Sequence, residues 1–281
     1  MSNQPGVLYV VATPIGNLDD LAPRALLTLN EVSLIAAEDT RHSSKLLRHF
    51  GILTPVTAFH EHNEREKAAE LVAFLISGKS IALISDAGTP LVSDPGYRLV
   101  RATHAAGIRV VPLPGACAAI VALSASGLPS DRFAFEGFPP VKSAARRAWF
   151  EALASEPRTL IVYESPHRIV ESLQDMLAVF GGAREAVYAR ELTKQLETVR
   201  HATLGELARW VAEDANQQRG EIVVLIHGAA PAAAETSEDA ARILRILIKE
   251  LPVSQAAALT AEITGQKKNQ LYELALQLKP G

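Results

Sequence analysis

One stretch decides the fold of this chain: Ile81-Ala82-Leu83-Ile84-Ser85-Asp86-Ala87-Gly88-Thr89-Pro90-Leu91-Val92-Ser93-Asp94-Pro95-Gly96. Its first four residues are apolar, which is typical of a buried parallel strand. The rest is polar and rich in glycine and proline, which predicts a loop at the carboxyl end of that strand. Ligands of open α/β sheets bind just outside the carboxyl ends of the strands. The stretch therefore predicts a ligand-binding loop, and the alternative is an ordinary strand–loop–helix connection capped by Asp94.

Four more apolar segments alternate with helical patterns around this strand. We expect strands at Val7–Ala12, Val32–Ala37, Val56–Phe59 and Arg109–Val111. Alternating strands and helices indicate a doubly wound parallel sheet with right-handed crossovers. Polar residues follow several of these strands, so their loops are expected to share one site along the sheet edge.

The second half of the chain mixes hairpin-like and crossover connections, which predicts a second α/β domain with a mixed sheet. The fold class is thus α/β, with two α/β domains, an active-site cleft between them and a small C-terminal helical domain. The expected boundaries are 1–127 for the N-terminal domain, 128–228 for the C-terminal α/β domain, 229–237 for a linker and 238–281 for the helical domain.

The helical domain is expected to contain three short helices, Glu238–Lys249, Val253–Ile263 and Lys267–Leu278. A helix-turn-helix is one interpretation, with Lys267 and Lys268 at the start of the third helix. A small helical cap is the other, and the nearly balanced charge of this segment favours it.

Composition narrows the classes of protein. The 281 residues carry a net charge of −3, which argues against a broad basic face that coats nucleic acid but leaves room for a local basic patch. A single cysteine, Cys117, excludes an internal disulfide. We expect no signal peptide, no membrane span and a cytoplasmic location.

Several common site types are absent or weak. The chain has neither the dinucleotide-binding glycine fingerprint nor the phosphate-binding loop with its lysine, so NAD and ATP are poor candidates. His60 and His62 have a metal-like spacing, but no second cluster supplies further ligands, and we expect no metal. Cys117 follows Pro-Gly-Ala and is interpreted as a small residue packed against a ligand, not as a nucleophile.

Charged residues cluster after three of the expected strands. Glu38, Asp39 and Arg41 follow one strand of the first half, where an N-cap for the next helix is the simpler interpretation of Asp39. The segments Tyr163–Arg168 and Arg190–Lys194 are the corresponding clusters in the second half. Together these groups are expected to line the cleft.

Eight motifs in order resemble those of the tetrapyrrole-methylase superfamily of S-adenosylmethionine-dependent methyltransferases. They are Thr-Pro-Ile-Gly-Asn-Leu (13–18), Ala-Glu-Asp-Thr-Arg (37–41), Phe-His-Glu-His-Asn-Glu (59–64), Ser-Asp-Ala-Gly-Thr-Pro (85–90), Pro-Gly-Ala-Cys (114–117), Tyr-Glu-Ser-Pro-His-Arg (163–168), Arg-Glu-Leu-Thr-Lys (190–194) and Gly-Glu-Ile-Val (220–223). Within the superfamily they are most similar to the enzymes that methylate a cytidine ribose 2′-hydroxyl in the decoding centre of 16S rRNA. Cys117 departs from the usual serine.

This resemblance implies S-adenosyl-L-methionine as cofactor, held in the cleft between the two α/β domains of a homodimer. The cofactor-binding residues that it implies are Pro14, Ser85, Asp86, Ala87, Gly88, Thr89, Val92, Ala116, Cys117, Tyr163, Glu221, Ile222 and Val223. Their chemistry suits the ligand, because Ser85 and Asp86 offer hydrogen-bond acceptors and Gly88 offers room.

A ribose hydroxyl is a poor nucleophile, so the enzyme has to align it and to accept its proton. Our hypothesis assigns this role to Asp39 or Glu38, with Arg41 holding phosphate or developing charge. The RNA contacts are expected at His60, His62, Arg168, Arg190 and Lys194. Arg146, Arg147 and Trp149 are further candidates, for which a plain surface helix is an equally good interpretation.

The resemblance also implies the partner, 16S rRNA within the small ribosomal subunit or its precursor. Two alternatives stay open. One is a methyltransferase of the same fold that acts on a tetrapyrrole or another small molecule. The other is a non-catalytic module that binds RNA or protein, since a fold alone does not select a function.

Overall fold

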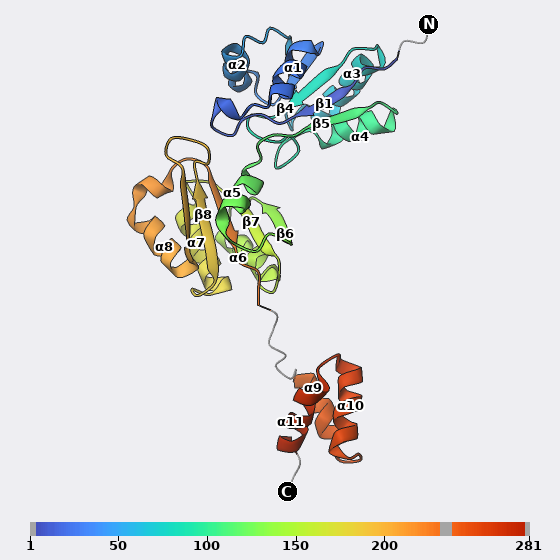
Figure 1. Cartoon of the computed structure of the whole chain (residues 1–281), viewed down its shortest axis with the longest axis vertical. Coiled ribbons are helices and arrows are strands. Elements are labelled where there is room, and N and C mark those ends of the chain that lie inside the picture. Colours follow the sequence, from blue (N-terminus) through green and yellow to red (C-terminus); the bar gives the residue numbers. More distant parts are fainter. Residues whose placement is uncertain (1–3, 231–237, 279–281) are drawn as a thin grey trace. The chain divides into compact units, whose positions relative to one another are not determined.

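The structure, a computed structural model, describes residues 4–230 and 238–278. The chain divides into two compact units, residues 1–228 and 229–281. The first unit contains two five-stranded sheets and the second contains three helices (Figure 1).

The first sheet is wholly parallel, in the strand order β3-β2-β4-β1-β5. Its strands are β1 (Leu8–Val11), β2 (Leu34–Ala37), β3 (Val56–Ala58), β4 (Ile81–Ile84) and β5 (Val110–Leu113). The expected strands are therefore confirmed to within one or two residues at either end. Strand β4 lies in the middle and is buried along its whole length, as its unbroken apolar run predicts.

Helices cover both faces of this sheet. They are α1 (Pro23–Glu31), α2 (Thr40–His49), α3 (Glu64–Ile76) and α4 (Tyr97–Ala105), with a short 3₁₀ helix at Leu18–Asp20. Helices α1 and α2 pack on one face through Leu29 and Leu47. Helices α3 and α4 pack on the other face through Leu71 and Leu99. All four loops that follow β1 to β4 thus emerge along one edge.

The second sheet has the order β6-β7-β10-β8-β9 and is mixed, as expected, because only β6 and β7 run parallel. Its strands are β6 (Phe133–Gly137), β7 (Thr159–Glu164), β8 (Glu185–Arg190), β9 (Thr198–Thr203) and β10 (Ile222–Ile226). Its helices are α6 (Ser143–Ala152), α7 (Ile169–Phe180) and α8 (Leu204–Glu213), with a 3₁₀ turn at Ala215–Gln218. A capping box formed by Thr203 and Glu206 starts α8 directly after β9.

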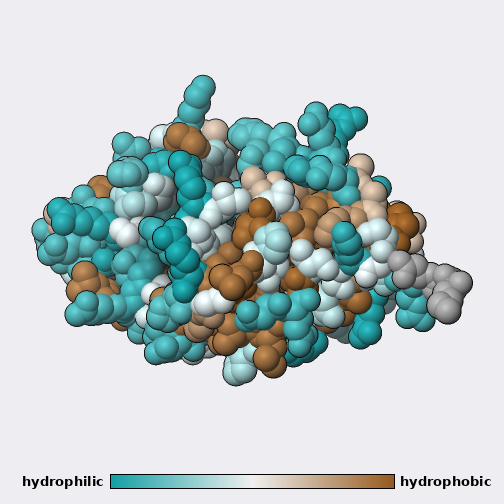
Figure 2. Space-filling model, turned by 90° about the horizontal axis from the view of Figure 1, so that it is seen from above, coloured by the Kyte–Doolittle hydropathy of each residue, from teal (hydrophilic) through white to brown (hydrophobic). Residues whose placement is uncertain are grey.

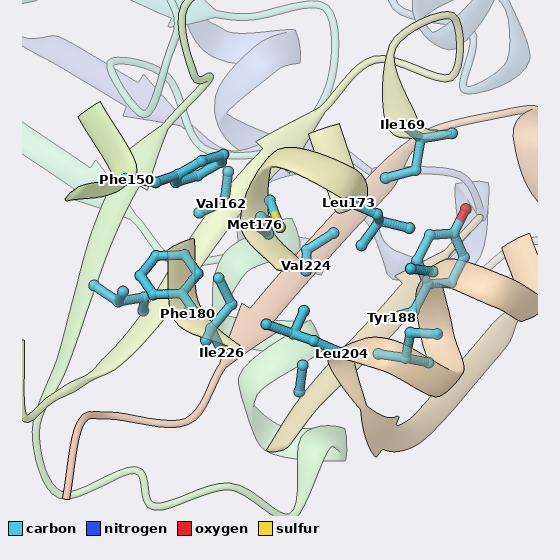
Figure 3. Close-up of a cluster of buried hydrophobic side chains, with 14 of the residues drawn as sticks. Phe150, Val162, Ile169, Leu173, Met176, Phe180, Tyr188, Leu204, Val224 and Ile226 are labelled. Carbon is cyan, nitrogen blue, oxygen red and sulfur yellow. The ribbon is translucent and has the colours of Figure 1, made fainter. Parts of the chain in front are cut away.

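One face of the second sheet carries the larger aromatic core (Figure 3). Side chains from the three helices meet those of the sheet, and Phe150 lies edge-on to Phe180 with 5.5 Å between ring centroids. Leu173 and Met176 are fully buried between the helices and the sheet. This core makes the second sheet a rigid support for the residues at its edge.

Helix α5 (Ala118–Ser126) covers the opposite face of the second sheet. Ala122 and Leu123 pack there against Ile161 and Val223. The domain boundary expected at residues 127 and 128 would leave this helix with the first sheet, whereas its packing joins it to the second. Gly127 ends the helix in the left-handed conformation with φ of 73°.

The second unit consists of α9 (Glu238–Leu247), α10 (Val253–Thr264) and α11 (Lys268–Leu278). They enclose a small core that includes Leu244, Ala257 and Leu271. The three helices expected here are confirmed, although α9 ends two residues earlier than predicted. The expected linker at 229–237 lies largely outside the described residues.

The surface is mostly hydrophilic on the face that Figure 2 shows, with hydrophobic residues gathered near its middle. Among the helices of residues 4–230 and 238–278, none combines the length and the hydropathy that a bilayer crossing needs.

Candidate active site

A cavity of about 320 Å³ lies within the first unit, where loops of the first sheet meet the second sheet. This volume falls in the range of roughly 300–1,000 Å³ that small-molecule sites occupy. Its lining comes from both halves of the chain: Ile15, Ala87, Gly88, Thr89, Val92, Ser93, Asp94, Cys117, Ala118, Phe138, Tyr163, Glu164, Ser165, Pro166, Gly220, Glu221, Ile222 and Val223. The polar turns therefore converge on one hollow.

The loops after β1 and β4 are tied together at the floor of this cavity. The amide of Thr13 donates to the Gly88 carbonyl at 2.8 Å, and the amide of Gly88 donates back at 3.1 Å. Gly88 has φ of +80°, and a Cβ there would lie 3.2 Å from Cγ2 of Ile15. The position thus needs glycine both for its backbone and for the close approach of the neighbouring loop.

Residues at and just before the start of α5 link the loop after β4, residues 85–96, to the second sheet. The Thr89 hydroxyl donates to the Ala116 carbonyl at 2.9 Å. The amide of Ala119 donates to the Tyr163 hydroxyl at 3.0 Å. Thr89 of the first half and Tyr163 of the second are therefore held on either side of the same short segment.

Aromatic rings and a buried ion pair form the wall on the second sheet. Tyr163 contacts Phe138 edge-on, with 5.5 Å between ring centroids. Glu164 is buried, and its Oε1 accepts from Arg168 at 2.7 Å, while Arg168 also donates to the Pro139 carbonyl. Arg168, expected to contact RNA, thus fixes the backbone next to Phe138.

Three carboxyl groups gather beside the cavity at the ends of β2 and β4. Partial burial, and then the charges of Asp94 and Asp86, raise the pKa of Glu38 to about 7. Burial raises the pKa of Asp94 to about 6, although a hydrogen bond from Ser85 opposes this. Asp86 accepts a hydrogen bond from the amide of Asp39 at 3.0 Å. Glu38 and Asp94 therefore hold their protons to higher pH than ordinary carboxyl groups.

Asp39 behaves differently from its neighbour Glu38. Its Oδ1 accepts from the amide of Arg41 at 2.8 Å, which makes it the N-cap of α2. This backbone hydrogen bond, with one from the Arg41 side chain, lowers the pKa of Asp39. The Arg41 side chain is 91% exposed. The cap that the sequence offered as the simpler interpretation of Asp39 is thus present.

Helix α4, which follows the loop after β4, is capped by a residue from outside that loop. Asp94, the cap in the alternative interpretation of this stretch, does not cap α4, whose N-cap residue is Gly96. The buried carboxylate of Glu64 accepts instead from the amides of Gly96 at 3.0 Å and Arg98 at 2.9 Å. The loop itself holds Leu91 at φ of 73° and Ser93 at 65°. Glu64 therefore clamps the end of a strained loop.

Two residues expected to contact RNA are engaged inside the protein. Arg190 is 6% exposed and donates to the Gln217 side chain, to the carbonyls of Arg219 and Leu196, and to the Thr198 hydroxyl. These contacts support a structural role.

Lys194 pairs with Glu191 at 2.8 Å and Glu221 at 3.0 Å. Its alkyl chain passes so close to Gly16 that a Cβ there would lie 2.3 Å from Cγ. This lysine therefore closes one end of the contact between the two halves.

The other residues that the sequence suggested as RNA contacts differ in their exposure. The rings of His60 and His62 lie 6.0 Å apart, edge to face, in the turn after β3, and His62 is exposed. In the described residues no group of three or more histidine, cysteine or acidic side chains is arranged to hold a metal. Arg146 is fully buried and pairs with Asp175 at 2.7 Å, so it is neither an exposed RNA contact nor a residue of a plain surface helix.

Nine of the thirteen expected cofactor-binding residues line the cavity, and each of the other four lies within two positions in the chain of a lining residue. Pro14, Ser85, Asp86 and Ala116 form this second group. Two of them contact lining residues, since the Ser85 hydroxyl donates to the Ala87 carbonyl and the Ala116 carbonyl accepts from the Thr89 hydroxyl. Phe138 lines the cavity without having been predicted. No motif surrounds it in the sequence, and only the fold brings it next to Tyr163.

Comparisons with known proteins agree with this geometry. The family described as Tetrapyrrole (Corrin/Porphyrin) Methylases matches residues 7–208, and the domain described as RsmI C-terminal HTH domain matches residues 234–279. The second match identifies the C-terminal unit as a helix-turn-helix domain, the interpretation that its charge had disfavoured.

Full-length relatives are similar over nearly the whole chain. Proteins named Ribosomal RNA small subunit methyltransferase I are 62% identical over 97% of both chains in Pseudomonas aeruginosa, and 57% identical over 98% of this chain and 96% of theirs in Escherichia coli O157:H7. A uroporphyrin-III C-methyltransferase from Thermus thermophilus, solved with S-adenosyl homocysteine, has a TM-score of 0.54 at 19% identity and covers 79% of this chain and 97% of that one. This last likeness concerns the fold.

Proposed function

The chain belongs to the tetrapyrrole methylase family, and from this membership we propose that it is an S-adenosylmethionine-dependent methyltransferase of the ribose 2′-hydroxyl of a cytidine in 16S rRNA. The observation that carries the proposal is the cavity in which the loop after β4 faces the second sheet, with Glu38, whose pKa is raised to about 7, beside it.

The residues around the cavity suit the cofactor. Ala87, Gly88 and Thr89 line the cavity, where Gly88 presents its backbone without a Cβ and so allows close approach of a ligand. Ile222 and Val223 offer an apolar wall, and Asp94 offers an acceptor. When bound, S-adenosylmethionine supplies a methyl group on a positively charged sulfur, and nearby carboxylates favour positive charge.

The role of the protein is to align the ribose hydroxyl and to accept its proton. Glu38 suits the second task, since a base works best with a pKa near the operating pH. Asp39 suits it less, because its carboxylate is engaged as the cap of α2 and its pKa is lowered. We therefore propose that Glu38 accepts the proton of the ribose hydroxyl and that Asp39 serves as the N-cap of α2.

The relatives that match nearly the whole chain support RNA, and not a small molecule, as the substrate. The relatives that are 57–62% identical and matched over 96–97% of their length are named as ribosomal RNA methyltransferases, whereas the uroporphyrin-III C-methyltransferases are 19–20% identical. The RNA is expected to present the target ribose from a single-stranded or irregular region. We propose that the enzyme acts in the cytoplasm, where small ribosomal subunits assemble, and as a homodimer, whose mass light scattering would measure.

The decisive experiment follows a labelled methyl group. The protein is incubated with labelled S-adenosylmethionine and either small ribosomal subunits that lack the modification or a porphyrinoid. We expect label in 16S rRNA, at one cytidine, in a form that resists alkaline cleavage because the 2′-hydroxyl is blocked. Label in the porphyrinoid, or in a base instead of a ribose, would reject the proposal.

A further inference from the structure

The exposed face of α2 carries a continuous row of basic side chains, Arg41, His42, Lys45, Arg48 and His49, which we call the α2 basic face. We propose that the α2 basic face binds the phosphate backbone of the RNA and delivers the target ribose to the carboxyl cluster. The proposal rests on the proposed function and adds to it the surface that holds the substrate.

The charge of this helix contrasts with that of the chain. Residues Thr40–His49 contain three Lys/Arg, two histidines and no acidic residue, whereas the whole chain has a net charge of −3. All five basic side chains are exposed, while Ser43 and Leu47 are buried on the opposite side of the helix. A local row of cations is what a protein needs in order to position a phosphate backbone.

Helix stability explains only part of this row. The N-terminus of a helix favours acidic side chains and the C-terminus favours basic ones. Arg48 and His49 in the last turn follow this rule, but Arg41 and His42 lie in the first turn, where no acidic residue is present. Residues that break a local rule without a structural return are expected at functional sites.

The cations are also available. Within the described part of the chain, the α2 basic face makes one ion pair, between Arg41 and Asp39, and its partners are exposed. Arg48 donates to the Ser44 hydroxyl at 3.1 Å, and neither Arg48 nor Lys45 has a carboxylate partner among the described residues. Phosphates would therefore meet cations that are not already neutralised.

The position of the helix joins this surface to the chemistry. Helix α2 begins at Thr40, two residues after Glu38, and its cap Asp39 is bonded through its amide to Asp86. The helix packs beside β3, the strand at the edge of the first sheet, so its outer side is open. A strand of RNA lying along α2 would bring a ribose to Glu38.

The test removes basic side chains from α2 and, as a control, from α4. In the double variant Lys45→Gln/Arg48→Gln, both residues lie outside the catalytic cluster. The matched control is Arg101→Gln on α4, an exposed arginine on the opposite face of the same sheet. Binding to unmodified small ribosomal subunits is measured over a range of salt concentrations, with cofactor affinity and melting temperature measured in parallel.

We expect the double variant to bind the subunit roughly tenfold more weakly at physiological salt, with a salt slope reduced by about one for each lysine or arginine removed. The control should keep both the affinity and the slope of the wild type. Cofactor affinity and saturating rate should be unchanged, so that only the KM for RNA rises. The swap Lys45→Arg/Arg48→Lys should restore binding.

Two results would overturn the inference. One is a double variant whose affinity and salt slope match those of the control, and the other is a charge-preserving swap that loses as much binding as the neutral variant. Failure of the proposed function is a separate observation, because the wild type itself would then transfer no methyl group to small-subunit RNA.

Discussion

The two halves of the first unit use their charged residues for opposite purposes. In the first half, Glu38, Asp86 and Asp94 lie beside the cavity with few cations to neutralise them, and two of them have strongly raised pKa values. In the second half, Arg190 and Glu164 are buried and bonded within the protein, Glu164 to the partly exposed Arg168. The first half thus supplies carboxyl groups that remain available for reaction, whereas the charged groups of the second half stabilise the wall of the cavity.

The largest expected effect tests the reactive side. Glu38→Gln should lower the single-turnover rate of methyl transfer by roughly 10²–10⁴-fold, because it removes the group that accepts the proton. Cofactor affinity measured by calorimetry should stay near that of the wild type. Asp39→Asn serves as control and should lower the rate only slightly. Equal losses in both variants would contradict the assignment of the proton to Glu38.

The second prediction tests whether the buried Arg190 of the second half has a structural role. Arg190→Ala should lower the free energy of unfolding by about 3 kcal/mol, because buried acceptors on Gln217, Arg219 and Leu196 lose their donor. The rate per folded molecule should be close to that of the wild type. Arg209→Ala, on the exposed side of α8, should change the unfolding free energy by less than about 0.5 kcal/mol. If the Arg190→Ala protein were stable but no longer bound RNA, the result would support the RNA contact that the sequence predicted for Arg190.

A smaller effect tests the clamp behind the reactive side. Glu64→Ala frees the amides of Gly96 and Arg98, so the strained loop should relax and cofactor affinity should fall about tenfold. The saturating rate should change little. Glu64→Gln keeps an acceptor oxygen and should recover most of the affinity, while the exposed neighbour Glu66→Ala should have no effect. A rate loss without an affinity loss would show that Glu64 acts on another step.

The smallest effect concerns pH. Since Glu38 has to be ionised to accept a proton, the saturating rate should rise as pH passes through about 7 and level off above it. The charge of Asp94 helps to raise the pKa of Glu38, so Asp94→Asn should move the midpoint of this rise to lower pH. An unchanged midpoint would show that the charge of Asp94 does not influence the pKa of Glu38.

Stability gives an independent measure of the same shift. The pKa of Glu38 is raised from 4.5 to about 7, so the folded protein holds a proton that the unfolded chain releases. This contribution to stability is present at pH below 4.5 and is lost as pH rises towards 7. Glu38→Gln should therefore melt at a higher temperature than the wild type at pH 8, and the difference should shrink towards pH 5.

The sequence predicts the first sheet well, because each parallel strand is a short apolar run followed by a polar turn. It also predicts which strand ends meet, since they share one edge. The burial of Arg146 and Arg190 could not be predicted, because their partners Asp175 and Gln217 lie 29 and 27 residues away. The clamp at Glu64 was hidden for the same reason, since it caps a helix that begins 33 residues later.

The packing of α5 escaped prediction for a different reason. Ala118–Ser126 is apolar on nearly all sides, so its pattern points to no particular face. Its assignment to the second sheet depends on Ile161, Val187 and Val223, which come later in the chain.

That packing decides how the molecule could be taken apart. A fragment that starts at Leu128 would leave the apolar face of the second sheet bare and prone to aggregate, while its companion would end in an orphan helix. A cut just after Leu113 would instead let the C-terminal fragment keep α5 as its own cover. Anyone who wishes to express the halves separately, or to graft the second onto another α/β sheet, should divide the chain at Pro114 and not at Gly127.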